Sequence, residues 1–156
     1  VFGALLCYTN QNLHHYDLDL KYDHVKLEQR IKVCAVVMHQ VCHRFNDGEQ
    51  AFTPKDIHEV TKIPQQIINH AVKELLQAKL LVEIRSEKKG SFEESIILHP
   101  IEKIDHLTYG AMIERLFTYG ADVVGLAEQN PDWEKWKDID VLNAEFVESG
   151  KSINFV

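Results

Sequence analysis

The chain has 156 residues, of which 45% are hydrophobic and 26% charged, and its 24 acidic and 17 basic side chains give a formal net charge of −7. This composition predicts one soluble globular domain with an ordinary core and argues against a disordered protein. Acidic residues are concentrated at the end of the chain, where residues 99–156 carry eleven Asp or Glu but only five Lys or Arg. A polyanionic partner is therefore not expected there.

Residues 1–8 are mostly apolar and begin without Met. They are too few to span a membrane, and they lack the basic flank and cleavage site of a signal peptide. We interpret them as the excised end of a longer apolar helix. The three cysteines, Cys7, Cys34 and Cys42, form no CxxC pair and leave one unpaired in any disulfide scheme, which favours a reducing compartment.

A long helix is predicted from Asp23 to about Phe45. Its apolar positions alternate steps of four and three, which is the spacing of a seam that packs against another long helix. The positions are Leu27, Ile31, Cys34, Met38, Val41 and Phe45. The stripe predicts either a self-association face, as in a dimer, or a scaffold helix beneath the domain that follows.

Two shorter helices are predicted next. Thr53 is a suitable N-cap, Pro54 suits the first helical position, and Asp56 can complete a capping box. After a break, a second helix runs from Pro64 to Lys79. Its apolar side chains recur at helical spacing: Ile67, Ile68, Ala71, Val72, Leu75 and Leu76.

A β-hairpin follows the second helix. The apolar run at residues 80–84, turn residues at 88–91 and a returning strand at 92–98 have the pattern of a two-stranded wing. The predicted fold class is therefore α+β, mostly helical: a winged helix-turn-helix with a three-helix core, a β-hairpin wing and additional N- and C-terminal helices.

Two more helices are predicted after the wing. The first runs from Thr108 to Tyr119 and ends at Gly120, a candidate left-handed C-cap. The second covers residues 131–149, and its acidic polar face argues against an anionic membrane surface, so we expect it to pack on the domain or on a partner. Its apolar residues are Trp133, Trp136, Ile139, Leu142 and Phe146.

A winged helix invites a DNA-binding interpretation, with the second of its helices in the major groove. However, residues 53–98 carry seven Lys or Arg and seven Asp or Glu, whereas phosphate binding depends on many cationic contacts. This balance argues against nucleic acid as a partner. The side chains that DNA binding would use are Gln65, Gln66, Asn69 and Lys73 at base edges, with Lys88 and Lys89 on phosphate.

The sequence contains no recognisable catalytic motif, with neither a GxSxG elbow nor a Walker lysine loop, and we predict no catalytic residue and no cofactor. His39 and His43 lie four residues apart on the long helix and could share a face that holds zinc or another borderline metal. The glutamate of the HExxH pattern is absent between them, so a solvated or core-edge histidine pair is the simpler interpretation.

Two segments resemble a known family. Phe2-Gly3-Ala4 and Tyr8-Thr9-Asn10-Gln11-Asn12, with the acidic stretch Tyr16-Asp17-Leu18-Asp19-Leu20, resemble the exit from the last membrane helix of the YihY/BrkB family, which is also labelled ribonuclease BN. Residues 100–108 are similar to the linker of its cytoplasmic extensions. The resemblance implies a C-terminal winged-helix extension at the cytoplasmic face of the inner membrane.

We accordingly divide the chain into residues 1–22, the end of a membrane helix and an extended linker; residues 23–120, the winged-helix domain; and residues 121–156, a linker and an amphipathic helix packed on the domain. The expected function is a regulatory or protein-interaction domain of such a membrane protein, acting through a protein partner or a homodimer. Two alternatives stay open. The first is a winged-helix DNA-binding transcriptional regulator, and the second is a component of a tRNA-processing ribonuclease.

Overall fold

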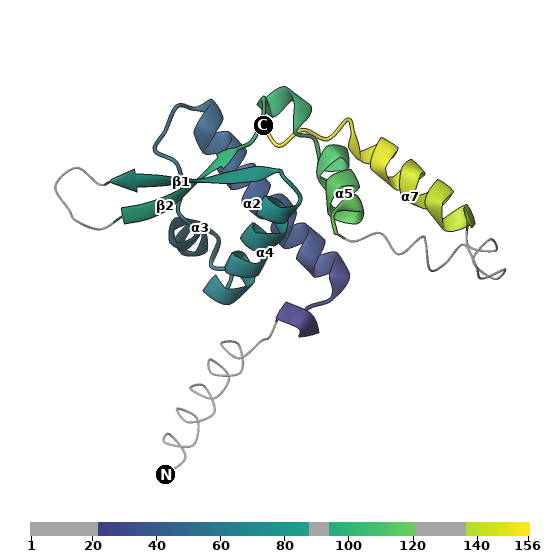
Figure 1. The fold of residues 1–156 in the computed structure, drawn as a ribbon, viewed down its shortest axis with the longest axis horizontal. Coiled ribbons are helices and arrows are strands. Elements are labelled where there is room, and N and C mark those ends of the chain that lie inside the picture. Colours follow the sequence, from purple (N-terminus) through teal and green to yellow (C-terminus); the bar gives the residue numbers. More distant parts are fainter. Residues whose placement is uncertain (1–21, 88–93, 121–136) are drawn as a thin grey trace, which may run out of the picture.

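The computed structural model of the chain describes residues 22–87, 94–120 and 137–156. The elements in chain order are η1 (Tyr22–His24), α2 (Leu27–Asn46), α3 (Pro54–Thr61), α4 (Gln65–Gln77), β1 (Leu81–Glu87), β2 (Glu94–Pro100), η2 (Ile104–His106), α5 (Tyr109–Thr118) and α7 (Lys137–Gly150). The hairpin projects from one end of the molecule, α5 and α7 lie at the other, and α2, α3 and α4 lie between them (Figure 1). The predicted fold class is confirmed: the protein is mostly helical, with one two-stranded antiparallel sheet in winged-helix order.

The long helix α2 begins later than its sequence pattern predicts. The residues from Tyr22 to His24 form a 3-10 turn, and the α-helix starts at Leu27 and runs for 20 residues. At its far end Asp47 caps the helix, and Gly48 takes a φ of 66°, a left-handed conformation that glycine adopts without steric cost. Asp47 and Gly48 therefore end the helix close to the predicted boundary at Phe45.

The hairpin is fixed to the helices by its second strand. β1 and β2 pair with Leu81 opposite Pro100 and Ile84 opposite Ile97. The amide of Leu98 donates to the carbonyl of Phe52 at 2.9 Å, so the chain just before α3 lies against β2. The strand predicted from residue 92 is described from Glu94, and the tip of the hairpin lies outside the described residues.

One hydrophobic core joins the helices to the base of the hairpin. Fully buried side chains come from α2 (Met38), α3 (Ile57), α4 (Leu75), β2 (Leu98) and α5 (Ile113). Burying one such side chain stabilises the fold by about 1.5–3 kcal/mol relative to leaving it exposed. Among the described residues, no buried polar or charged residue interrupts this core.

The last two helices meet at a pair of glycines. A Cβ on Gly110 would lie 2.4 Å from the carbonyl oxygen of Val147, and one on Gly150 would lie 2.8 Å from the amide nitrogen of Gly110. Neither position therefore has room for a side chain, and this close approach holds α7 against α5. Of the described helices, none is long and apolar enough to cross a membrane.

The end of the chain returns to the core. The amide of Tyr109 donates to the carbonyl of Ile153 at 2.8 Å, Phe155 is buried, and its carbonyl oxygen accepts a hydrogen bond from Nδ1 of His39 at 2.7 Å. The C-terminal residues thus connect α5 to α2.

Gly120 has the positive φ expected of a glycine that follows a helix, at 116°, but the helix ends one residue earlier than predicted. That helix, α5, ends at Thr118, because Tyr119 already has extended backbone with φ −75° and ψ 144°. Trp133 and Trp136 of the final predicted helix lie outside the described residues, and α7 is described from Lys137 onward.

Candidate nucleic-acid interface

The first helix of the helix-turn-helix is set by its N-terminal cap. The Thr53 hydroxyl accepts from the amide of Asp56 at 3.2 Å, while the Asp56 carboxylate accepts from the amide of Thr53 at 2.8 Å. The predicted capping box is therefore confirmed. It satisfies two amides that the start of a helix would otherwise leave unpaired.

The turn between α3 and α4 depends on one unusual backbone conformation. Lys62 has a φ of 61°, and its amide donates to the carbonyl of His58 at 2.8 Å. Nδ1 of His58 also forms a hydrogen bond with the carbonyl oxygen of Ile63 at 2.6 Å, so the His58 side chain joins the two ends of the turn. Pro64 is the N-cap residue of α4, and the helix itself begins at Gln65.

The two faces of α4 are sharply different. Ile67, Ile68, Ala71, Val72 and Leu75 are buried against the core. The exposed residues of the helix are Gln66, Asn69, His70, Lys73 and Gln77. All five of these side chains can donate hydrogen bonds, and none is a carboxylate. We call this exposed face of α4 the reading face. It presents hydrogen-bond donors, and base edges and phosphates carry matching acceptors.

The structure brings together the four predicted DNA-contacting residues that it describes. Gln65, Gln66, Asn69 and Lys73 follow one another along the first three turns of α4, and Nε2 of Gln65 donates to Oδ1 of Asn69 at 2.8 Å. The other two predicted contacts, Lys88 and Lys89, lie outside the described residues. Contact between these residues and DNA stays a prediction.

An open groove of about 970 Å³ lies between the start of α3, the first turn of α4 and the hairpin. Its charged lining is mixed: Arg44 and Lys55 contribute positive charge, while Asp56, Glu59 and Glu83 contribute negative charge. A basic groove is therefore absent at this position among the described residues.

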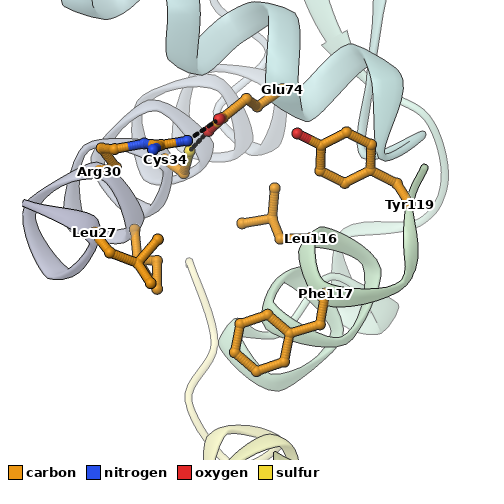
Figure 2. Close-up of a pocket in the computed structure, with 8 residues that line it drawn as sticks. Leu27, Arg30, Cys34, Glu74, Leu116, Phe117 and Tyr119 are labelled. Carbon is orange, nitrogen blue, oxygen red and sulfur yellow. Dashed lines mark hydrogen bonds and ion pairs between the residues drawn. The ribbon is translucent and has the colours of Figure 1, made fainter. Parts of the chain in front are cut away.

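A polar network that no sequence pattern indicated lies on the inner side of α4. Oε1 of Glu74 accepts from the Arg30 guanidinium at 2.8 Å, Oε2 accepts from the Tyr22 hydroxyl at 2.5 Å, and the Cys34 thiol lies 3.7 Å from Oε2 (Figure 2 shows Arg30, Cys34 and Glu74). Burial raises the pKa of the Cys34 thiol to about 12 and raises the pKa of the Tyr22 hydroxyl above its usual range. Both groups are therefore neutral at physiological pH.

The same network reaches the reading face. The Arg30 guanidinium lies 4.5 Å above the centre of the Tyr22 ring, and that ring stacks on His70 with 4.8 Å between ring centres and 6° between planes. These contacts are separated by 48 residues of sequence, between Tyr22 and His70, so no local pattern could have indicated them.

The candidate metal ligands His39 and His43 do lie together on α2, with ring centres 5.6 Å apart. Their Nδ1 atoms are engaged elsewhere: that of His39 with the carbonyl of Phe155, and that of His43 with Asp47 at 2.8 Å. Within the described ranges, no group of three or more His, Cys, Asp or Glu side chains could hold a metal ion. A metal at this pair stays a prediction.

The predicted self-association seam on α2 needs correction. Cys34, Met38 and Val41 are 1%, 0% and 2% exposed and belong to the core of the domain itself. Only the two ends of the stripe, Leu27 and Phe45, are substantially exposed. The heptad-like spacing therefore arises because α2 is the scaffold helix against which α4 and the hairpin pack.

No family model matches the sequence, and no curated protein matches it. Two solved structures share the fold. CymR (YrzC), the global cysteine regulator of B. subtilis, is 14% identical, with a TM-score of 0.55 over 84% of this chain and 93% of CymR. The fold is that of CymR. Staphylococcus aureus CymR is 16% identical, with a TM-score of 0.50 over 81% of this chain and 92% of its own. At these identities the likeness establishes the fold alone.

These neighbours overturn the resemblance to the YihY/BrkB family. The two solved structures described above match across most of the chain and are both CymR, and no family model supports that membrane protein family. The short motif at residues 2–20 that carried the resemblance lies outside the described residues. The assignment to an inner-membrane protein labelled ribonuclease BN is therefore wrong.

Proposed function

We propose that this protein is a winged-helix transcriptional regulator that binds duplex DNA with α4 in the major groove. The observation that carries the proposal is the reading face: the five exposed residues of α4 are Gln66, Asn69, His70, Lys73 and Gln77, all hydrogen-bond donors. In helix-turn-helix proteins, the second helix reads base edges in the major groove. The solved neighbour from B. subtilis is itself described as a global cysteine regulator.

The balanced charge of residues 53–98 does not count against this proposal once the side chains are placed. Glu74 is the one carboxylate of α4, and it faces Arg30 and Tyr22 on the inner side. Asp56 is held in the cap of α3. Lys62 and Lys73, in contrast, are both exposed, and within the described residues neither forms an ion pair. The reading face itself therefore carries no carboxylate, and the exposed acids Glu59 and Glu83 lie in the mixed groove beside it.

Fluorescence anisotropy of a labelled, mixed-sequence duplex at low and moderate salt tests the proposal. We expect salt-sensitive binding that a reading-face variant, Gln66→Ala with Asn69→Ala and Lys73→Ala, weakens at least tenfold. A matched control removes the same kinds of side chain from exposed positions on α2 and α7: Gln29→Ala, Asn143→Ala and Lys32→Ala. Equal binding by both variants would exclude α4 as the reading element, and absence of any binding at low salt would exclude the function.

A homodimer is the second part of the proposal, and a specific surface favours it. Phe117 on α5 and Ile139, Leu142 and Phe146 on α7 are 44%, 44%, 63% and 44% exposed. The Phe117 and Phe146 rings lie 6.3 Å apart, so the two helices form one apolar surface. Contiguous apolar surfaces of this kind mark interaction sites, and paired helix-turn-helix units bind the two half-sites of an operator.

Light scattering tests the dimer separately from DNA. We expect a dimer mass for the unmodified protein and a monomer mass after Leu142→Glu with Phe146→Glu. Val60→Glu on α3 is the control, because Val60 is 55% exposed and lies outside this surface. A monomer mass for the unmodified protein would reject this part and leave the DNA-binding part standing.

A further inference from the structure

A small pocket opens beside the inner edge of α4, between the start of α2 and the end of α5 (Figure 2). Its volume is about 110 Å³, whereas pockets for drug-sized ligands have about 300–1,000 Å³. Half of its eight lining residues are apolar: Leu27, Ile31, Leu116 and Phe117. The size and the lining suit a ligand with a short aliphatic body.

The polar side of the pocket is formed by Arg30, Cys34, Glu74 and Tyr119. Both oxygens of Glu74 already accept hydrogen bonds, from Arg30 and from Tyr22. Nε of Arg30, in contrast, is buried without a hydrogen-bond partner in the described part of the chain. An unsatisfied buried donor costs about 1–3 kcal/mol. Nε itself is shielded from solvent, but the Arg30 side chain as a whole is 29% exposed and lines the pocket, so its terminal guanidinium nitrogens can donate to an acceptor on a ligand.

We propose that this pocket binds a small aliphatic carboxylate, with its carboxylate on the Arg30 guanidinium and its alkyl group against Leu27, Ile31 and Leu116. An arginine pairs with a carboxylate through charge-assisted hydrogen bonds. An amine of the same skeleton is disfavoured at this guanidinium, because an ammonium group has no lone pair with which to accept a hydrogen bond from it.

Occupation of the pocket would act on the DNA-reading helix, and this step rests on the function proposed above. Arg30 contacts Glu74 on α4 and lies over the Tyr22 ring, which stacks on His70 of the reading face. A second carboxylate draws the guanidinium toward the pocket and weakens its contacts to Glu74 and Tyr22. The ligand thereby changes the position of α4 and the affinity for DNA.

Isothermal titration calorimetry without DNA tests the site itself. We expect saturable binding of isovalerate at millimolar concentration and none of isoamylamine, which has the same carbon skeleton. Arg30→Gln should weaken binding at least tenfold, and Leu116→Trp should do the same by filling the pocket. Lys32→Gln is the control, because Lys32 lies on the same helix but is exposed and paired with Glu28.

Two variants are used because Arg30→Gln also breaks the ion pair with Glu74 and so affects folding as well as binding. Leu116 is only partly buried, so its substitution disturbs the core less. Isovalerate binding that both variants retain would overturn the site, as would equal binding of the amine or no saturable binding at all.

Duplex binding then tests the coupling. We expect saturating isovalerate to change the apparent duplex Kd by roughly fivefold or more, in the range of typical allosteric coupling, and to have no effect on Leu116→Trp. If isovalerate binds and the duplex Kd does not change, the coupling is wrong. If no duplex is bound with or without isovalerate, the proposed function fails, while the calorimetric result still decides the pocket.

Discussion

The two faces of α4 show how one helix separates folding from recognition. On the inner face Ile68, Ala71 and Leu75 are fully buried, and Glu74 joins a network with α2. On the outer face Gln66 and Lys73 are exposed and take no part in the core. The inner residues therefore determine the free energy of unfolding, whereas the outer ones are available to a ligand. Substitutions on the two faces should affect different measurements.

The largest expected effect comes from the inner face. Leu75→Ala removes most of a fully buried side chain and should lower the free energy of unfolding by about 2–5 kcal/mol, because it forfeits apolar burial and leaves a cavity. Urea unfolding followed by circular dichroism measures the change. Gln77→Ala, two residues along and exposed, is the control and should leave the midpoint unchanged. Similar losses in the two variants would mean that the assignment of faces is wrong.

The network around Glu74 should have a smaller effect. Glu74→Gln keeps the size of the side chain but removes the charge that pairs with Arg30, and hydrogen bonds to charged groups contribute about 1.5–3 kcal/mol. We expect the free energy of unfolding to fall by about 1–3 kcal/mol in the same urea assay. Glu28→Gln removes an exposed partner of Lys32 on α2 and should have no measurable effect, because solvent screens such pairs.

Sequence patterns predict the buried face of α4, but they do not predict the contacts of Glu74 with α2. The spacing of Ile67, Ile68 and Leu75 predicts the buried face, and the capping residues Thr53 and Asp56 predict where the preceding helix begins, because both signals are local. The contacts of Glu74 with Arg30 join residues 44 positions apart, so they depend on the crossing of α2 and α4. The charge count over residues 53–98 therefore included a carboxylate that pairs with α2 and does not belong to the reading face.

The apolar stripe on α2 also has two interpretations that the sequence does not distinguish. Its spacing correctly predicts a helix with one apolar side, but the same spacing suits a dimer seam and an internal scaffold. Only the tertiary structure shows that Met38 and Val41 are covered by the protein's own elements. The close contact of Gly110 with Gly150, which holds α7 to α5, likewise has no local signature.

Two lysines that flank α4 have left-handed backbone, and replacing them tests the roles of the two ends of the helix. Lys62 has a φ of 61° and Lys79 a φ of 55°, a conformation that costs most side-chain-bearing residues roughly 1–2 kcal/mol and glycine almost nothing. Lys62→Gly and Lys79→Gly should each raise the free energy of unfolding, by up to about 1 kcal/mol after the entropy lost by glycine is included. Thermal unfolding measures both.

Duplex affinity should distinguish these two glycine variants. Lys62 lies in the turn that leads into the reading face, whereas Lys79 follows the far end of α4, where its carbonyl accepts from Arg115 at 2.8 Å. We expect Lys62→Gly to weaken duplex binding in the anisotropy assay and Lys79→Gly to leave it unchanged. A loss of affinity in Lys79→Gly alone would place the DNA at the wrong end of the helix.

Lys73→Gln should have the smallest effect on stability and the most diagnostic effect on binding. Lys73 is exposed and forms no ion pair within the described residues, so its loss leaves the unfolding midpoint unchanged. If its ammonium contacts a phosphate, the substitution should weaken binding to all duplex sequences alike and reduce the slope of log K against log salt by about 1. Lys79→Gln, at the other end of the helix, should not change that slope. If the protein binds DNA and the slope is unaltered in Lys73→Gln, the Lys73 ammonium contacts no phosphate, and the cations that release counterions lie elsewhere on the protein.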